Sequence, residues 1–278
     1  MILVTGGTGN VGREVVAELV GSGQRVRALA RDPRSALFPP GVDVVPGDLG
    51  APDSLAAALD GVRKVFLLLF LPGVDFGKVT EVVARSKVEH VVLLSSVRAA
   101  SPEGGLVGQV NRLAEDAVRE SGRGWTFLRP GAFASNALQW AGGVRSDRVV
   151  RAFGGDFRSA PIDPADIAAV AARALVSDAY LGAAPVLSGP GVLTAREQAA
   201  VLGDALGEPV AFEELPEDVA RGALRRAGYP EPFADAMVEM QKNTDPSLAQ
   251  VTPAVEEITG TPARGFRRWA GTHVAAFR

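Results

Sequence analysis

Residues 1–12 read Met1-Ile-Leu-Val-Thr-Gly-Gly-Thr-Gly-Asn-Val-Gly12, and this stretch decides the fold. A short apolar run predicts a buried strand, glycines follow at positions 6, 9 and 12, and apolar residues at helical spacing come next. A strand, a glycine turn and a helix in this order are typical of dinucleotide binding, because glycine permits positive φ and lets a phosphate approach the backbone amides. An ordinary structural turn is the alternative. We expect cofactor contacts from Gly6, Thr8, Gly9, Asn10, Val11 and Gly12.

Short strands and helices alternate from this turn to about residue 131. The pattern predicts strands at 24–30, 42–45, 65–69, 90–94 and 125–128, with helices at 52–59, 74–86 and 109–121 between them. Such alternation predicts a parallel sheet with helices on both faces, and right-handed crossovers make it doubly wound. The predicted class is therefore α/β, with a Rossmann-like doubly wound parallel sheet.

The regular alternation of strands and helices ends after Gly131, and helical patterns dominate the rest of the chain. We expect helices at 133–144, at 164–175, from Thr194 with a capping box to Glu197, and at 216–227, 231–242, 247–259 and 264–277. A loop is expected at 145–158, and brief strands at 185–187 and 210–213. This pattern predicts a nucleotide-binding domain over residues 1–180 and a smaller, mostly helical C-terminal substrate lobe over 181–278, with help from about 131–160. A cleft between them would hold the substrate.

Composition excludes several classes of protein. The chain has 278 residues, 47% of them hydrophobic, which is enough for a large core. It has no cysteine and two histidines, so we expect no disulfide, thiolate nucleophile or metal site. A net charge of −3 argues against nucleic acid as a partner. The most apolar run, 65–71, is too short to cross a bilayer, and no secretory leader is visible. We expect a cytoplasmic protein without membrane contact that is compatible with a homodimer.

Residues that directly follow the strands are the other candidates for a ligand site, because ligands lie beyond the carboxyl ends of parallel strands. Asp48 has two interpretations, a hydrogen bond to the adenine amine or a cap on the next turn. Ser95 and Ser96 likewise either reach the cofactor or substrate or cap the following segment. The remaining candidates are apolar. Leu69 and Phe70 would wall the nicotinamide ribose, Pro130 and Phe133 would flank the nicotinamide, and Leu49 is a candidate cofactor contact next to Asp48.

Arg31, directly after the second strand, indicates the cofactor. NAD sites usually have an acidic residue here for the ribose hydroxyls, whereas a 2′-phosphate favours a guanidinium. Asp32 follows, and we expect it to cap a helix that begins at Pro33. The sequence therefore favours NADP (NADPH) over NAD.

Several motifs occur along the chain in a set order: Thr5-Gly-Gly-Thr-Gly-Asn-Val-Gly12, Ala30-Arg-Asp-Pro33, Gly47-Asp-Leu49, Leu94-Ser-Ser96, Leu128-Arg-Pro130 and Ile162-Asp-Pro-Ala-Asp166. Together they resemble the atypical short-chain dehydrogenase/reductases, in particular the NmrA-like group that includes NADPH-dependent quinone oxidoreductases. The resemblance covers nearly the whole chain and implies a nucleotide-binding reductase with a small-molecule substrate.

One expectation of that resemblance fails in the sequence. Ordinary short-chain dehydrogenases use Tyr-x-x-x-Lys as a proton donor, but the residues four positions after Tyr180 and Tyr229 are alanine and phenylalanine. In the corresponding segment Asn111 stands where many relatives have histidine, and it can orient a carbonyl but cannot titrate. Hydride addition to a quinone or conjugated carbonyl leaves a delocalised, weak base, so positioning alone can suffice. We expect such a flat substrate.

Two other functions fit the same residues. One is a non-catalytic redox sensor that binds the nucleotide, and the other is an isomerase or auxiliary biosynthetic enzyme that has kept the nucleotide.

Elsewhere in the chain, we expect His90 to be partly exposed at a strand boundary and His273 to pack on Trp269 and Phe277. The basic residues 264, 267 and 268 are expected to form a solvated helix face.

Overall fold

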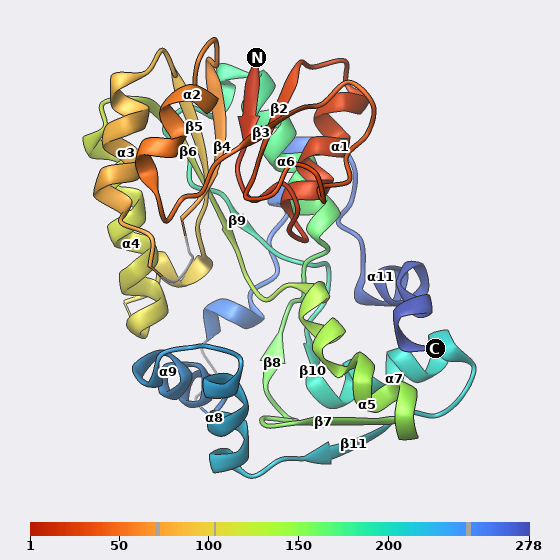
Figure 1. Ribbon diagram of the computed structural model, residues 1–278. Helices are drawn as coiled ribbons and strands as arrows, with labels where there is room; N and C mark the ends of the chain where they lie inside the picture. The colour runs from red at the N-terminus through yellow and green to blue at the C-terminus, as the bar shows by residue number, and fades with distance from the viewer. Residues whose placement is uncertain (70–72, 103, 243–245) are drawn as a thin grey trace.

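The computed structural model describes residues 1–69, 73–102, 104–242 and 246–278, and its centre is a parallel sheet. Within these residues the sheet has seven strands in the order β3-β2-β1-β4-β5-β6-β9, all parallel (Figure 1). The strands are β1 (Ile2–Val4), β2 (Val26–Ala30), β3 (Asp43–Pro46), β4 (Lys64–Leu68), β5 (His90–Leu94), β6 (Gly124–Pro130) and β9 (Val186–Leu187). The order reverses beside β1, as in a doubly wound sheet, so the predicted fold class is confirmed.

Helices cover both faces of the sheet. One face carries α1 (Gly12–Gly21), α6 (Pro164–Val176) and α10 (Ala254–Thr259), whose apolar side chains form one buried cluster with β1, β2 and β6. The other face carries η1 (Pro52–Ser54), α2 (Leu55–Ala58), α3 (Phe76–Arg85) and α4 (Gly105–Glu120). Because β1, β4 and β5 are buried on both faces, they contain the continuous apolar runs 2–4, 65–68 and 91–94 rather than alternating patterns.

A smaller lobe lies below the carboxyl edge of the sheet in Figure 1. Its core is formed by Val144, Val150, Leu202, Trp269 and Phe277. Its elements are η3 (Ala134–Trp140), α5 (Ala141–Asp147), β7 (Val149–Ala152), β8 (Arg158–Ser159), β10 (Leu193–Thr194), α7 (Ala195–Leu206), β11 (Ala211–Glu214), α11 (Phe266–Thr272) and η6 (Val274–Phe277). The helices α8 (Glu217–Arg226) and α9 (Glu231–Lys242) pack on one another beside the same lobe.

The remaining short helices are η2 (Val97–Ala99), η4 (Asp178–Tyr180) and η5 (Pro246–Ala249). The capping box predicted at Thr194 is confirmed, because its hydroxyl accepts from the Glu197 N–H while the Glu197 carboxylate accepts from the Thr194 N–H. Among the described residues, no helix combines the length and apolar composition needed to cross a bilayer.

Two predictions about the lobe and the core are wrong. The expected loop at 145–158 contains β7, which pairs in parallel with β11 more than fifty residues away, a contact that no local pattern reveals. His90 is not a partly exposed boundary residue but is only 2% exposed. Its Nε2 pairs with the Thr126 hydroxyl at 2.9 Å, and no partner for Nδ1 lies in the described part of the chain.

Candidate nucleotide-binding site

The glycine turn lies at the point where the strand order reverses. Thr5 joins the ends of β1 and β4, since its hydroxyl donates to the Phe66 carbonyl at 3.1 Å and accepts from the Leu68 N–H at 2.9 Å. Gly6 then has φ +63°, and a Cβ at this position would stand 2.9 Å from the Leu68 side chain. The turn therefore needs glycine both for its backbone conformation and for its packing on β4.

Gly12 is held against the same turn more tightly still. A Cβ at Gly12 would lie 2.1 Å from the Gly6 carbonyl oxygen, so only glycine lets α1 start directly over the turn. The N–H groups of Asn10, Val11 and Gly12 donate to no group in the described ranges. Unpaired amides at the start of a helix, on a backbone cleared of side chains, fit the pyrophosphate of a dinucleotide.

Arg31 lies on the surface just after β2, on the side where the adenosine end of a dinucleotide would lie. Its guanidinium makes no hydrogen bond or ion pair with another described residue. The helix expected from Pro33 is absent, and the segment forms a turn in which the Asp32 carboxylate accepts from the Arg34 N–H at 3.1 Å. Asp32 therefore caps a turn and not a helix. Phe38, which follows this turn, packs next to Gly7.

Asp48, in the segment after β3, makes its hydrogen bonds with nearby residues. The Asp48 carboxylate accepts from the Gly50 N–H at 2.9 Å, and the main-chain N–H of Asp48 donates to the Ser54 hydroxyl. Asp48 is exposed, whereas Leu49 and Leu69 are buried in the core on the α2–α4 face of the sheet. Phe70 lies outside the described residues.

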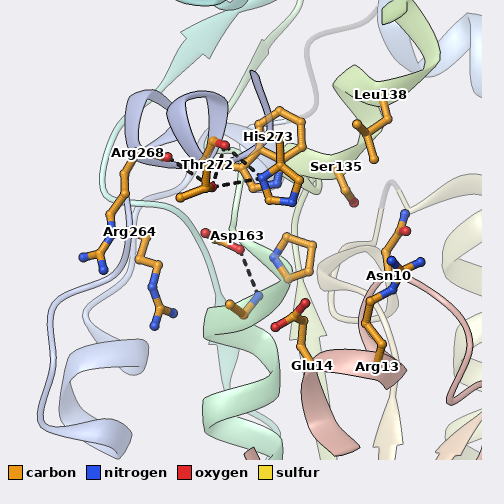
Figure 2. A pocket seen from close by; sticks show the side chains of 13 residues that line it. Asn10, Arg13, Glu14, Ser135, Leu138, Asp163, Arg264, Arg268, Thr272 and His273 are labelled. Atoms are coloured by element: carbon orange, nitrogen blue, oxygen red, sulfur yellow. Dashed lines mark hydrogen bonds between the residues drawn. The ribbon is translucent and has the colours of Figure 1, made fainter. Parts of the chain in front are cut away.

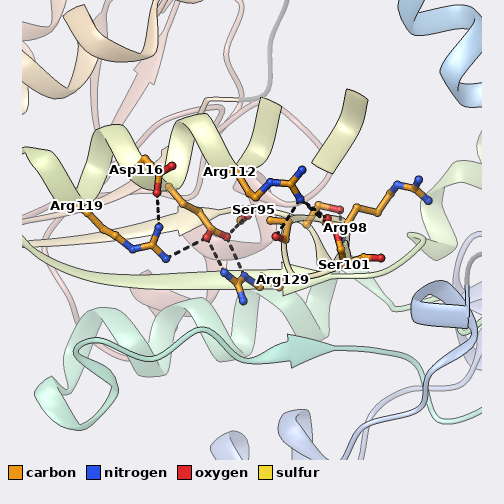
Figure 3. A network of polar contacts seen from close by, with 10 residues as sticks. Ser95, Arg98, Ser101, Arg112, Asp116, Arg119 and Arg129 are labelled. Atoms are coloured by element: carbon orange, nitrogen blue, oxygen red, sulfur yellow. Dashed lines mark hydrogen bonds and ion pairs between the residues drawn. The ribbon is translucent and has the colours of Figure 1, made fainter. Parts of the chain in front are cut away.

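Ser95, at the end of β5, belongs to a buried network that the sequence did not reveal (Figure 3). Its hydroxyl donates to Glu115 at 2.6 Å, and Arg129 donates to both carboxylate oxygens of Glu115 at 2.9 and 2.6 Å. Glu115 is 1% exposed, so its charge is neutralised inside the protein by Arg129. The network fixes α4 on β6 next to the expected nicotinamide position.

Ser96 and Asn111 flank that network. The Ser96 hydroxyl accepts from the Arg98 N–H, which caps the short helix η2. Asn111 sits on α4 one turn before Glu115 and is 4% exposed, and its amide donates to the Val107 carbonyl at 2.9 Å. Asn111 and Glu115 therefore lie one turn apart, and both are buried on α4.

Pro130 and Phe133 follow β6 at the entrance to the lobe. Pro130 is buried and Phe133 is half-buried, and the segment after Pro130 pairs with Ile162 through main-chain hydrogen bonds on both of its sides. Ser135, two residues on, is 6% exposed, and its hydroxyl has no partner in the described residues.

A cavity of about 320 Å³ lies beside the glycine turn, between α1, η3, α6 and α11 (Figure 2). The helix α6 begins at this cavity, with Asp163 as its N-cap accepting from the Ala165 N–H. Its lining residues are Asn10, Arg13, Glu14, Ser135, Leu138, Asp163, Pro164, Ala165, Arg264, Arg268, Trp269, Thr272 and His273.

The basic residues of the last helix region are not one solvated face. Arg264 pairs with the buried Asp166 at 2.6 Å and Arg267 pairs with Asp204, whereas Arg268 has no carboxylate partner among the described residues. Burial raises the pKa of Asp166, and Arg264 opposes this shift. A charge count along a helix could not distinguish these three environments. His273 stacks on Trp269 with ring centroids 4.5 Å apart, and it also lines the cavity.

Comparison with known proteins gives consistent matches. A family model described as NAD(P)H-binding matches residues 6–178. A (4-alkanoyl-5-oxo-2,5-dihydrofuran-3-yl)methyl phosphate reductase of Streptomyces griseus is 46% identical, over 100% of this chain and 99% of that protein. An NAD(P)H azoreductase of Xenophilus azovorans is 37% identical over 100% of this chain and 99% of its own. The structure of an Escherichia coli NADPH-dependent quinone oxidoreductase complexed with NADPH has a TM-score of 0.82 at 25% identity, covering 98% of this chain and 99% of that one.

Proposed function

The chain belongs to the NAD(P)H-binding family, among the NmrA-like atypical short-chain dehydrogenase/reductases, and on that premise we propose that it is an NADPH-dependent reductase of flat conjugated carbonyl compounds. The observation that carries the nucleotide part is the close packing of Gly12 on Gly6, which leaves a bare turn with free amides. When bound, the reduced nicotinamide supplies the hydride. The protein's own residues bind the nucleotide and the substrate, orient them, and shield the reacting groups from water.

Arg31 supports NADPH over NADH. Its guanidinium is unengaged by other described residues and follows β2, where the 2′-position of the adenosine ribose would lie. A planar guanidinium matches a phosphate through paired, charge-assisted hydrogen bonds. The quinone oxidoreductase of similar fold was solved with NADPH, which points the same way.

The chemistry of the site favours a conjugated acceptor. The chain lacks a Tyr-x-x-x-Lys dyad, and Tyr180 donates to the Ile258 carbonyl between α6 and α10, away from the ends of β4 and β5. Reduction of an isolated ketone would produce a strongly basic alkoxide without a donor nearby. A conjugated acceptor spreads the charge, so proximity and orientation supply the acceleration.

The substrate of the Streptomyces griseus relative is such an acceptor. Its name describes an unsaturated five-membered lactone whose double bond is conjugated with the ring carbonyl and the alkanoyl carbonyl, and which carries a phosphomonoester. We propose a substrate of this class for this chain. In the proposed complex Phe133 and Pro130 contact the flat ring, and Asn111 orients a carbonyl through the second N–H of its side-chain amide.

The test is NADPH oxidation with this butenolide phosphate, a panel of quinones and an isolated aliphatic ketone. We expect turnover with the conjugated compounds and background rates with the ketone. Background rates with every conjugated compound, in protein that binds NADPH, would contradict the reductase and favour the nucleotide sensor. Equal rates with the ketone would contradict the argument from the missing dyad.

A further inference from the structure

The hairpin of α8 and α9 is held together by surface charges. Every described residue of α8 is at least partly exposed. Among the described residues, three ion pairs cross between the two helices: Asp235 with Arg221 at 3.3 Å, Glu231 with Arg225 at 3.0 Å and Lys242 with Glu217 at 3.2 Å. The side of α9 that carries residues 231, 235 and 242 therefore faces α8.

Met237 and Met240 lie on the opposite side of α9. A helix turns about 100° per residue, so both positions are about half a turn of the helix away from residues 231, 235 and 242. Both methionines are half-buried, and the remaining methionine of the chain is Met1. Within the described ranges, neither side chain packs against the three apolar core clusters. The two residues therefore form a narrow apolar stripe that the cores of the protein do not use.

The helix α9 touches both parts of the protein. It contacts α4, the helix that carries Asn111, and Figure 1 shows α9 between α4 and α8. Its last turn packs on the loop after β7, since a Cβ at Gly154 would lie 3.0 Å from the Gln241 Cβ. Ligands of parallel sheets bind beyond the carboxyl edge, which is the edge nearer to α9 in Figure 1. The methionine stripe is therefore on the α4 side of α9, next to the expected position of the substrate.

The size and chemistry of the stripe favour a hydrocarbon chain as its ligand. Two half-buried methionines offer far less area than the roughly 800 Å² per partner of a standard protein interface. Their unbranched thioether side chains adapt to the shape of flexible apolar groups. A methylene transferred from water to such a surface raises affinity by up to about fourfold.

We propose that Met237 and Met240 bind the alkyl chain carried by the flat substrate and so determine which chain lengths are preferred. The inference rests on the proposed function for the head group of the ligand, whose alkanoyl substituent supplies such a chain. In the proposed complex the ring lies against Phe133, and the chain extends along α4 to α9. Exposed ion pairs such as those between α8 and α9 each contribute little stability, so the hairpin can shift to fit chains of different length.

The experiment measures affinity as a function of chain length. Calorimetry uses protein loaded with NADP+, which has no hydride to transfer, and two ligand series: butenolide phosphates from acetyl to octanoyl and naphthoquinones from methyl to octyl. The variants are Met237→Ala and Met240→Ala. Val219→Ala is the matched control, because Val219 is 40% exposed on the side of α8 away from α9. A naphthoquinone with a diazirine at the end of its chain labels the residues that the chain contacts.

We expect the affinity of the wild type to rise with chain length in both series, by up to about fourfold per methylene. Each methionine variant should reduce the ratio of octanoyl to acetyl affinity about fivefold, because it removes half of the stripe. Val219→Ala should keep the wild-type ratio. The diazirine should label the peptide that contains residues 231–242.

Three results would overturn the proposal: affinity independent of chain length in both series, an equal loss in Val219→Ala, or photolabelling mainly outside α9. Photolabelling uses the wild type, so it is informative even if a methionine variant does not fold. Chain dependence in the quinone series alone would support the chain site and contradict the butenolide head group. None of these measurements needs turnover, so the chain site and the proposed function can fail separately.

Discussion

Gly12 is the residue with the least freedom in the candidate site. An added methyl group would meet the main chain of Gly6 and Gly7, which cannot rotate away as a side chain could. The turn and the start of α1 can therefore pack together only when residue 12 has no side chain. A methyl group there would displace the amides that would face the pyrophosphate.

Gly12→Ala is expected to weaken NADPH binding at least about tenfold and to lower the free energy of unfolding by about 1–3 kcal/mol, because overpacking forces the backbone apart. Fluorescence titration and urea unfolding measure the two effects. Gly21→Ala is the matched control at the other end of α1, where a Cβ meets nothing within 4 Å. Wild-type affinity in Gly12→Ala would refute the close-packing argument.

Arg31→Ala is expected to lower the affinity for NADPH about tenfold or more and to leave NADH unchanged, since only NADPH carries the 2′-phosphate. Parallel titrations with both nucleotides measure the selectivity. Arg25→Ala, just before β2 at the other edge of the sheet, is the control. Equal losses for both nucleotides, or no loss, would contradict the assignment of Arg31.

At the scale of elements, the buried ion pair between Glu115 and Arg129 joins α4 to β6. Glu115 also accepts from Ser95, directly after β5, and, at 3.3 Å, from Arg119 on its own helix. One carboxylate therefore holds a helix against two strand ends. Removing its charge leaves the Arg129 guanidinium, whose side chain is 17% exposed, without a counter-charge.

Glu115→Gln is expected to destabilise the fold by about 3 kcal/mol, the lower end of the cost of breaking a buried pair. Asp116→Asn is the matched control, because Asp116 pairs with Arg119 from an exposed position on the same helix and should cost less than about 1 kcal/mol. Urea unfolding compares the two. If they cost the same, the buried network contributes nothing beyond a surface pair.

At the scale of the whole molecule, His90 makes stability depend on pH. Burial, with a smaller contribution from the Lys64 ammonium, lowers the pKa of His90 to about 4, while Asp178 acts in the opposite direction. The folded protein thus keeps the ring neutral where the unfolded chain, with an ordinary histidine pKa of about 6.5, takes up a proton. The stabilisation is complete above pH about 6.5 and is lost as the pH falls toward 4.

The wild type is therefore expected to lose up to about 3 kcal/mol of unfolding free energy between pH 6.5 and 4 through this group. His90→Gln keeps a polar group beside Thr126 but does not titrate, so its profile should be flatter by that amount. Chemical denaturation at a series of pH values gives the difference. Parallel profiles for the two proteins would show that His90 is not responsible.

The sequence by itself determined the sheet, the glycine turn and the family. These features depend on local patterns, namely apolar runs, glycines at 6, 9 and 12 and a capping box at Thr194, and the structure confirms the fold and the box. The assignments of Arg31 and Asn111 stay predictions, because the contact of a side chain with a ligand depends on where that ligand binds.

Tertiary structure alone decided the pairing of β7 with β11, the burial of His90, and the separate environments of Arg264, Arg267 and Arg268. It also decided that Glu115 faces Ser95 and Arg129, and that Ser135 lies by a cavity with Arg268. Each of these contacts joins segments that are distant in sequence. Whether such a side chain is solvated, paired or buried depends on the distant segments that the fold places next to it. The local periodicity of the sequence does not indicate which segments these are.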